Sequence, residues 1–265
     1  MPSVSNIAIG ANMAAAAATK ARHGMNESIA RLSTGVRAMY GGDAAGYSMG
    51  QQTKAVSQSY AQATRNIEDA MSFAQQGESV LLEVANLAQR LRELAITADN
   101  AAILDANQEA ALNSEAALIG DTITAVLDKT DFNTFEVVDS AAAKEYTIAY
   151  ASLTANTTEV GPNVSIASQA GITAAAGAEA NADAVLAGVA EGLGNLAADL
   201  TALKAHQGAA SATSANMAAA GARLIDTDFA LETASLTKNA ILNQAALAMA
   251  AQANSAQSSI LSVLQ

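Results

Sequence analysis

Few residues of this chain have the types and spacing that enzyme chemistry requires. The best match to a cofactor motif is Gly192-Leu193-Gly194-Asn195-Leu196-Ala197, which fits the Gly-x-Gly-x-x-Ala form of a dinucleotide-binding turn. Such a turn needs a strand before it and an acidic residue about 20 positions after it. Here the two leucines belong to a helical heptad stripe and no acidic residue follows at that spacing. The hypothesis that the chain is a nucleotide-dependent enzyme therefore rests on this motif alone.

The other candidates for chemistry are weaker. Residues 41–46 form a glycine-rich stretch, but it lacks the Lys-Ser/Thr pair that holds phosphates. His23 and His206 have no ligand-type neighbour at metal-binding spacing, and the chain has no cysteine. Asp226 and Asp228 have no partner base, so we interpret them as capping residues of a joint between helices. We expect no catalytic residue, no cofactor, no metal and no enzyme activity.

Composition indicates a long-helix protein. Aromatic residues make up 3% of the 265 residues, tryptophan is absent, and the two prolines are Pro2 and Pro162. The formal charge of −12 argues against a nucleic-acid partner. No cleaved signal peptide is recognisable, because the N-terminal stretch has no basic region followed by a Leu-rich run. No membrane-inserted helix is recognisable, because the C-terminal stretch carries too much Gln and Asn.

The C-terminal stretch, residues 239–265, carries no charged side chain, yet its apolar residues keep heptad spacing. A water-exposed helix usually has charges on its outer face, so the pattern predicts a helix surrounded by protein. The seam positions are Leu242, Ala246, Met249, Ala253, Ala256, Ile260 and Val263.

The N-terminal stretch repeats this pattern, and we predict that the two ends pair with each other. Its heptad positions are Val4, Ile7, Ala11, Ala14, Ala18, Ala21, Met25 and Leu32, with Ser28 at one further position. Ordering a residue costs about 1–2 kcal/mol of backbone entropy, whereas a buried methylene returns only about 0.8 kcal/mol. We therefore expect both ends to be loose in the free subunit and to become ordered by packing against many copies.

Between the ends we expect a mainly α fold, a long antiparallel helical bundle or coiled coil with a small β-hairpin tip. Helices are predicted over residues 47–98, 105–130 and 178–222, with Leu118 on the inner face of the second. Residues 132–175 are rich in β-formers separated by turn residues, which predicts one or two hairpins. The domains would be 1–46 and 223–265, which form the two halves of a terminal-helix domain with its joint, and 47–222, the core.

Several short motifs occur in order along both ends of the chain. Toward the N-terminus they are residues 28–37 (SIARLSTGVR), 43–46 (DAAG), 65–66 (RN), 89–95 (QRLRELA) and 132–133 (FN). Toward the C-terminus they are residues 223–232 (RLIDTDFALE), 241–245 (ILNQA), 251–254 (AQAN) and 260–264 (ILSVL). These motifs resemble the N- and C-terminal signatures of one family, the bacterial flagellins. Thr134, where many members have glycine, departs from the pattern, as do Gly42 and Gly208.

This resemblance implies a secreted, self-polymerising subunit of the extracellular flagellar filament, a minimal member with inner coiled-coil and outer core domains only. It implies export in an unfolded state through the flagellar type III apparatus, and swimming motility. The partners it implies are further copies of the chain, an export chaperone, the filament cap and the hook–filament junction proteins.

One segment carries two interpretations. Gln89, Arg90 and Glu93, with Glu115 on the following helix, match positions where some flagellins are recognised, as monomers, by a Toll-like receptor. The same residues suit an inter-subunit contact.

Two alternatives to flagellin remain, a hook–filament junction protein and a cytoplasmic hairpin like a chemoreceptor stalk. The β-formers near the chain midpoint argue against the second.

Overall fold

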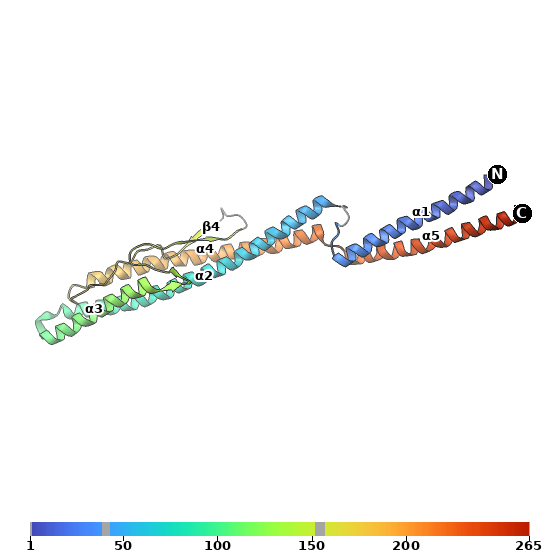
Figure 1. The fold of residues 1–265 in the computed structure, drawn as a ribbon. Coiled ribbons are helices and arrows are strands. Elements are labelled where there is room, and N and C mark those ends of the chain that lie inside the picture. Colours follow the sequence, from blue (N-terminus) through green and yellow to red (C-terminus); the bar gives the residue numbers. More distant parts are fainter. Residues whose placement is uncertain (1, 39–42, 152–156, 265) are drawn as a thin grey trace. The chain divides into compact units, whose positions relative to one another are not determined.

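The computed structural model describes residues 2–38, 43–151 and 157–264, with the side chains of residues 2–8, 101, 260, 261, 263 and 264 excepted. The chain forms two compact units. The terminal unit comprises Met1–Ala55 and Asn216–Gln265, and the central unit comprises Val56–Ala215. The described elements are helices apart from two short pairs of strands, which confirms the mainly α fold class (Figure 1).

In the terminal unit, α1 (Pro2–Thr34) and α5 (Phe229–Leu264) lie side by side and antiparallel, so the two chain ends are neighbours (Figure 1). The predicted pairing of the two terminal helices is therefore confirmed. Helix α1 ends at Gly35, whose φ of +69° is the left-handed conformation that glycine adopts most easily. At the start of α5, the Asp228 carboxylate accepts hydrogen bonds from the backbone N–H groups of Ala230 and Leu231, at 2.9 and 3.2 Å.

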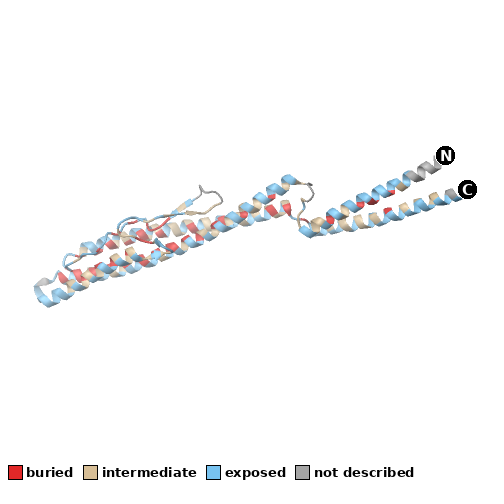
Figure 2. Cartoon of the chain, viewed as in Figure 1, coloured by how far each residue is buried: buried red, intermediate tan, exposed pale blue. Residues whose placement is uncertain are grey.

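The central unit contains most of α2 (Ala44–Ala98), the short 3-10 helix η1 (Ala101–Ile103), α3 (Ala106–Lys129) and most of α4 (Glu179–Ile225). Asp105 and Gln108 form a reciprocal capping box at the start of α3, as their spacing predicts. The hydrophobic core is continuous across this unit, and Figure 2 shows its buried residues along the inner faces of the helices. Its largest fully buried side chains on these helices are Ile67, Leu81, Leu91, Ile123, Leu127, Leu196 and Leu203.

The predicted β region forms two antiparallel pairs. Strand β1 (Asp131–Phe132) pairs with β2 (Phe135–Glu136), and β3 (Tyr146–Ala149) pairs with β4 (Thr157–Val160). These strands lie beside the helices instead of beyond their ends, as the edge-to-face contact of Phe73 on α2 with Phe132 shows. Predicted β-formers between and after the strands, such as Val137 and Ile166, are buried in irregular structure.

The interpretation of α3 was wrong at one position. Leu118, expected on the inner face, is 67% exposed, and the inner face is formed by Ala116, Gly120, Ile123 and Leu127. Gly120 lies against the backbone of Gln169, because a Cβ at position 120 would be 2.5 Å from that carbonyl oxygen. The buried face of α3 therefore includes a glycine, because the neighbouring backbone leaves no room for a side chain there, and large apolar residues do not identify that face.

Among the described residues, no helix combines the length and apolar character needed to cross a bilayer.

Candidate assembly surface

The contact between α1 and α5 is built from small residues. The buried residues of the two helices are Ala14, Ala18, Ala21, Ser28 and Ala246. Ala11, Ala253 and Ala256 are half-buried, while the side chains of Val4, Ile7, Ile260 and Val263 lie outside the described set. In Figure 2 the two terminal helices are accordingly mostly exposed, with only scattered buried positions.

The two helices approach closely at Gly24. A Cβ placed on Gly24 would lie 2.7 Å from Nδ2 of Asn239, so the amide of Asn239 occupies the space that a side chain would take. The buried Oγ of Ser28 and Oδ1 of Asn243 have no hydrogen-bond partner among the described residues. Small and polar residues therefore set how closely these helices pack, and large apolar residues contribute little to the contact.

The buried and half-buried residues of α5 overlap in part with the predicted heptad seam. From residue 239 onward they include Asn239, Asn243, Ala246, Ala250, Ala253 and Ala256, of which Ala246, Ala253 and Ala256 belong to that seam. Leu242 and Met249 are 48% and 60% exposed. They line a groove of about 480 Å³ along one side of the helix pair, together with Ala17, Lys20, Ala21, Gly24, Lys238, Asn239, Ala245 and Ala246.

Large apolar side chains of the terminal helices face solvent instead of each other. Nine are exposed by 48% or more: Ile9, Met13, Ile29, Phe229, Leu231, Ile241, Leu242, Leu247 and Met249. Contiguous exposed apolar surface is typical of protein–protein contacts, and Leu242 and Met249 of this set share one groove. The surface is thus suited to burial by further protein, which the helix pair alone does not supply.

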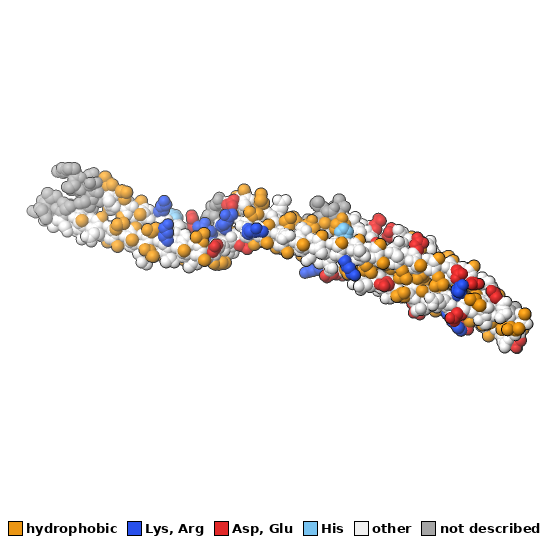
Figure 3. Space-filling model, turned by 180° about the vertical axis from the view of Figure 1, so that it is seen from behind, with side chains coloured by type: hydrophobic (Ala, Val, Ile, Leu, Met, Phe, Trp, Pro, Cys, Tyr) orange, Lys and Arg blue, Asp and Glu red, His pale blue; other side chains and the backbone are white. Residues whose placement is uncertain are grey.

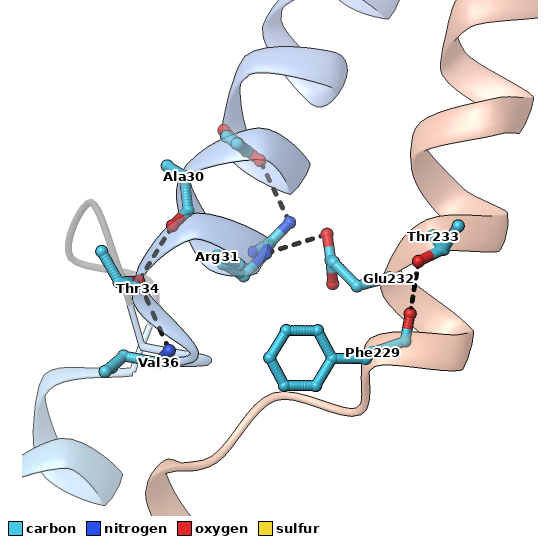
Figure 4. Close-up of polar contacts among 8 residues, drawn as sticks. Ala30, Arg31, Thr34, Val36, Phe229, Glu232 and Thr233 are labelled. Carbon is cyan, nitrogen blue, oxygen red and sulfur yellow. Dashed lines mark hydrogen bonds and ion pairs between the residues drawn. The ribbon is translucent and has the colours of Figure 1, made fainter.

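The joint at the base of the helix pair is held by ion pairs and a short backbone ladder. The Arg31 guanidinium reaches from α1 to the Glu232 carboxylate on α5 at 3.1 Å, and only 14% of the Glu232 side chain is exposed (Figure 4). The Phe229 ring points from α5 toward α1 beside this pair (Figure 4).

The chain segment that follows α1 and the segment that follows α4 run antiparallel to each other at this joint. The backbone N–H of Arg37 donates to the Ile225 carbonyl at 2.7 Å, and that of Thr227 donates to the Gly35 carbonyl at 2.9 Å. The Arg37 guanidinium also donates to the Asp43 carboxylate, at 3.0 Å. These contacts tie the ends of α1 and α4 together; residues 39–42 of the predicted joint lie outside the described residues.

In the central unit, the structure brings together three of the four residues singled out near position 90. The Arg90 guanidinium donates to Glu115 on α3, at 2.7 and 3.0 Å, and to Glu93 at 3.2 Å. These hydrogen bonds, chiefly the one to Glu115, raise the pKa of Arg90. Gln89 is exposed and makes no hydrogen bond among the described residues. The cluster is a surface feature that joins α2 to α3.

The residues considered for enzyme chemistry have other roles. Residues 192–197 lie inside α4, where Gly192 packs against Val164 and Leu81. The His206 ring stacks on Tyr150, with ring centroids 3.9 Å apart. Within the described ranges, no three His, Cys, Asp or Glu residues are grouped as metal ligands would be.

Charge is divided unequally between the two units. The terminal unit has seven basic and five acidic residues, a formal charge of +2, whereas the central unit has six basic and 20 acidic residues, a formal charge of −14. Figure 3 shows acidic side chains spread over the surface of the central unit. Copies of this unit would repel one another unless their basic residues meet acidic residues of a neighbour.

Sequence reasoning missed one feature, a cluster of aromatic side chains on the central unit. Phe73, Phe132, Phe135 and Tyr146 line a pocket beside the β1–β2 pair. The available signal was the spacing Phe132-Asn133-Thr134-Phe135, two aromatic residues around a two-residue turn.

Comparison with known proteins gives matches at both ends of the chain. Residues 5–143 match the family model described as "bacterial flagellin N-terminal helical region", and residues 180–264 match that of the "bacterial flagellin C-terminal helical region". Residues 144–179, with β3 and β4, lie outside both matches.

Curated relatives match along nearly the whole chain. A flagellin of Halalkalibacterium halodurans is 32% identical over 252 residues, which cover 89% of this chain and 90% of the relative. A flagellin of Bacillus subtilis is 28% identical over 89% of this chain and 91% of its own length. A flagellar filament core protein of Brachyspira hyodysenteriae is 28% identical, with coverages of 91% and 92%.

Proposed function

Because the chain belongs to the bacterial flagellin family, we propose that its two terminal helices are the surface through which copies assemble. The chain is a secreted structural subunit of the extracellular flagellar filament, which polymerises with itself and is not an enzyme. The observation that carries the proposal is the exposure of nine large apolar side chains on helices that bury mainly Ala and Ser between them.

The seam positions have two tasks in this proposal. Ala14, Ala18 and Ala246 are used inside the subunit, since they are buried between α1 and α5. Leu242 and Met249 are exposed in the single chain and contact neighbouring copies. Val4, Ile7, Ala11, Ala253, Ala256, Ile260 and Val263 complete the seam. Because Leu242 and Met249 are 48% and 60% exposed in the single chain, burying what remains in the polymer would contribute about 0.7–1.8 kcal/mol for each side chain.

The first test asks whether the terminal helices become ordered only when the chain polymerises. In dilute monomer we expect fast amide hydrogen exchange over residues 2–35 and 230–264, and slow exchange over the same residues after polymerisation. The physical reason is that a helix pair lined by alanine returns too little free energy to order itself. The central unit, with its large buried side chains, serves as the internal control and stays protected in both states. Equal protection of the terminal helices in dilute monomer would contradict the proposal.

Truncation gives the second test. Deleting Ala251–Gln265 removes part of α5 and no residue of the hydrophobic core of the central unit. We expect a monomer with an unchanged thermal transition of the central unit that forms no filaments by electron microscopy. Normal filaments from this truncated chain would refute the assignment of the terminal helices.

A substitution pair tests the seam within the full-length chain. Leu242→Gln with Met249→Gln places polar groups at two exposed seam positions, and we expect filament yield to fall sharply while the monomer stays folded. The matched control, Gln244→Ala with Gln252→Ala, changes two exposed residues of α5 outside the seam. Equal loss of polymerisation in both pairs would refute the seam assignment.

The proposal extends to the partners that handle such a subunit. We assign swimming motility to the filament, and export of the chain in an unfolded state through the flagellar type III apparatus. The charge-free, apolar stretch from Asn239 onward is the segment that an export chaperone would cover. Cap and hook–filament junction proteins would receive the subunit at the two ends of the filament. The family matches favour neither the junction-protein alternative nor the chemoreceptor-like hairpin.

The cluster around Arg90 supports a contact between copies, with Toll-like receptor binding by free monomer as a second role. Arg90, Glu93 and Glu115 form one surface group together with the adjacent Gln89. Arg90→Ala tests both roles, because it leaves two carboxylates without their partner. An unchanged critical concentration for polymerisation, measured beside unchanged receptor activation by monomer, would remove both assignments.

A further inference from the structure

The aromatic cluster on the central unit encloses a pocket that the assembly of the terminal helices does not use. Phe73 comes from α2, Phe132 and Phe135 from the β1–β2 pair, and Tyr146 from β3, around a volume of about 320 Å³. The chain has only four phenylalanines, and three of them are here. In this Ala-rich chain, several aromatic side chains lie together at one surface pocket. Aromatic side chains are well suited to recognition.

The rings stand nearly at right angles to one another. Phe73 contacts Phe132 and Tyr146 edge to face, with centroids 5.9 and 5.2 Å apart and interplanar angles of 80° and 83°. Phe135 contacts Tyr146 at 5.2 Å and 72°. The Tyr146 hydroxyl donates to the Glu136 carbonyl at 2.8 Å, which fixes that ring. Each edge-to-face contact covers one ring face with the edge of the other ring, and a face left open to the pocket carries negative electrostatic potential that attracts cations.

A carboxylate without a partner completes the pocket. Asp69 lines it, is exposed, and has no hydrogen bond or ion pair among the described residues. The basic residue of the neighbouring loop, Lys144, is already engaged with Glu136 and Asp139, at 2.7 Å each. The pocket therefore combines aromatic faces with an uncompensated negative charge.

The turn beside the pocket is strained. Asn133 and Thr134 connect β1 to β2 with φ values of +48° and +72°. Both central residues of a type I′ turn need positive φ, which a β-branched residue such as Thr134 adopts only at a cost. Phe135, next along the chain, is 52% exposed. Strained backbone is found more often at functional sites than elsewhere, and here it lies next to an exposed ring of the pocket.

We propose that this pocket receives a Lys or Arg side chain of a second copy of the chain. The proposal rests on the filament function above and deepens it. Seven of the 13 basic residues have no ion pair in the described structure: Lys20, Arg22, Arg65, Lys129, Lys204, Arg223 and Lys238. Central units of charge −14 pack together only where such cations meet acidic sites of a neighbour. Asp69 with its aromatic walls is one such site.

Small cations test the chemistry of the pocket in dilute full-length monomer. Tetramethylammonium and methylguanidinium are titrated while the ring signals of Phe135 and Tyr146 are followed by NMR, with tert-butanol as the neutral analogue. We expect the cations to bind about tenfold more tightly than the alcohol, and Asp69→Asn to remove most of that preference. Equal binding of the neutral analogue would overturn a cation site, because a merely apolar pocket does not distinguish charge.

Assembly tests the second copy as the source of the cation. Asp69→Asn is expected to raise the critical concentration for polymerisation about tenfold with the thermal transition of the monomer unchanged. Asp121→Asn, which changes net charge equally at an exposed, unpaired acid of α3, is the matched control and should leave the critical concentration near that of the wild type. Identical behaviour of the two variants overturns the proposal, whereas failure of the wild type itself to form filaments would instead refute the proposed function.

A set of double mutants identifies the partner cation. Each of the seven unpaired basic residues is changed to Gln, alone and together with Asp69→Asn, and the critical concentrations are compared. The cation that enters the pocket is the one whose loss adds no further effect once Asp69 is neutral. Additive effects for all seven would exclude a cation of a second copy.

Discussion

Replacing Thr134 with glycine should stabilise the central unit. Thr134 has a φ of +72°, its side chain is exposed, and it makes no hydrogen bond among the described residues, so the substitution removes strain and little else. A left-handed conformation costs a non-glycine residue about 1–2 kcal/mol. Glycine loses about 0.5–1 kcal/mol more conformational entropy on folding. The difference leaves a net gain between about 0 and 1.5 kcal/mol, and a gain of about 1 kcal/mol lies in the upper half of that range.

The assay is thermal unfolding of dilute monomer by calorimetry, together with urea unfolding followed by circular dichroism. For a unit of this size, residues 56–215, a gain of about 1 kcal/mol raises the transition temperature by about 2–4 °C. In urea the midpoint should rise with no change in slope, because the surface exposed on unfolding stays the same.

Two control variants separate relief of strain from other effects. Thr134→Ala keeps a Cβ at the left-handed position, so most of the strain should remain. Thr147→Gly lies in β3, where extended backbone suits threonine, and should lower stability by about 0.5–1 kcal/mol. If Thr134→Gly proved no more stable than the wild type, the turn would not be strained as the geometry indicates.

Two further predictions concern the packing and electrostatics of the central unit. Gly120→Ala should lower the free energy of unfolding by about 1–3 kcal/mol, because its Cβ would lie 2.5 Å from the Gln169 carbonyl oxygen. Gly194→Ala, on an open helix face, should instead raise it by about 0.5–1 kcal/mol; urea unfolding of both variants checks the contrast, and equal effects would contradict it. Burial raises the pKa of the Asp199 carboxyl, so the folded state is penalised at neutral pH and gains stability as pH falls through the raised pKa. Asp199→Asn should therefore stabilise the protein at pH 7, with an advantage that shrinks toward acidic pH; thermal unfolding across that range checks this, and an advantage independent of pH would contradict it.

Local sequence signals predicted the ends of the helices well. Gly35 takes the left-handed conformation that glycine adopts readily after a helix end, and Asp105 with Gln108, three positions later, forms a capping box. Asp228 caps α5 in the same way. Each of these features depends on a few neighbouring residues, so sequence alone contains the necessary information. The pairing of the terminal helices followed from matched heptad patterns at the two ends of the chain.

The buried face of each helix was much harder to predict. Leu118 on α3 and Leu242 on α5 are exposed although both fit an apolar stripe. Alanine occurs around the whole circumference of these helices, so several stripes are compatible with burial. Gly120 lies against the backbone of Gln169, and Asn239 lies against Gly24, because these segments approach closely there, and only the position of the neighbouring segment reveals that.

The sequence by itself determined the helical class, the joints, the pairing of the chain ends and the absence of cysteine chemistry, because these depend on composition and on short-range spacing. Only the tertiary structure decided that Phe73, Phe132, Phe135 and Tyr146 meet around one pocket beside Asp69. Phe73 and Tyr146 are 73 positions apart, and nothing local to either residue encodes their contact. In a chain with so few large side chains, the register between helices and strands decides which of them meet.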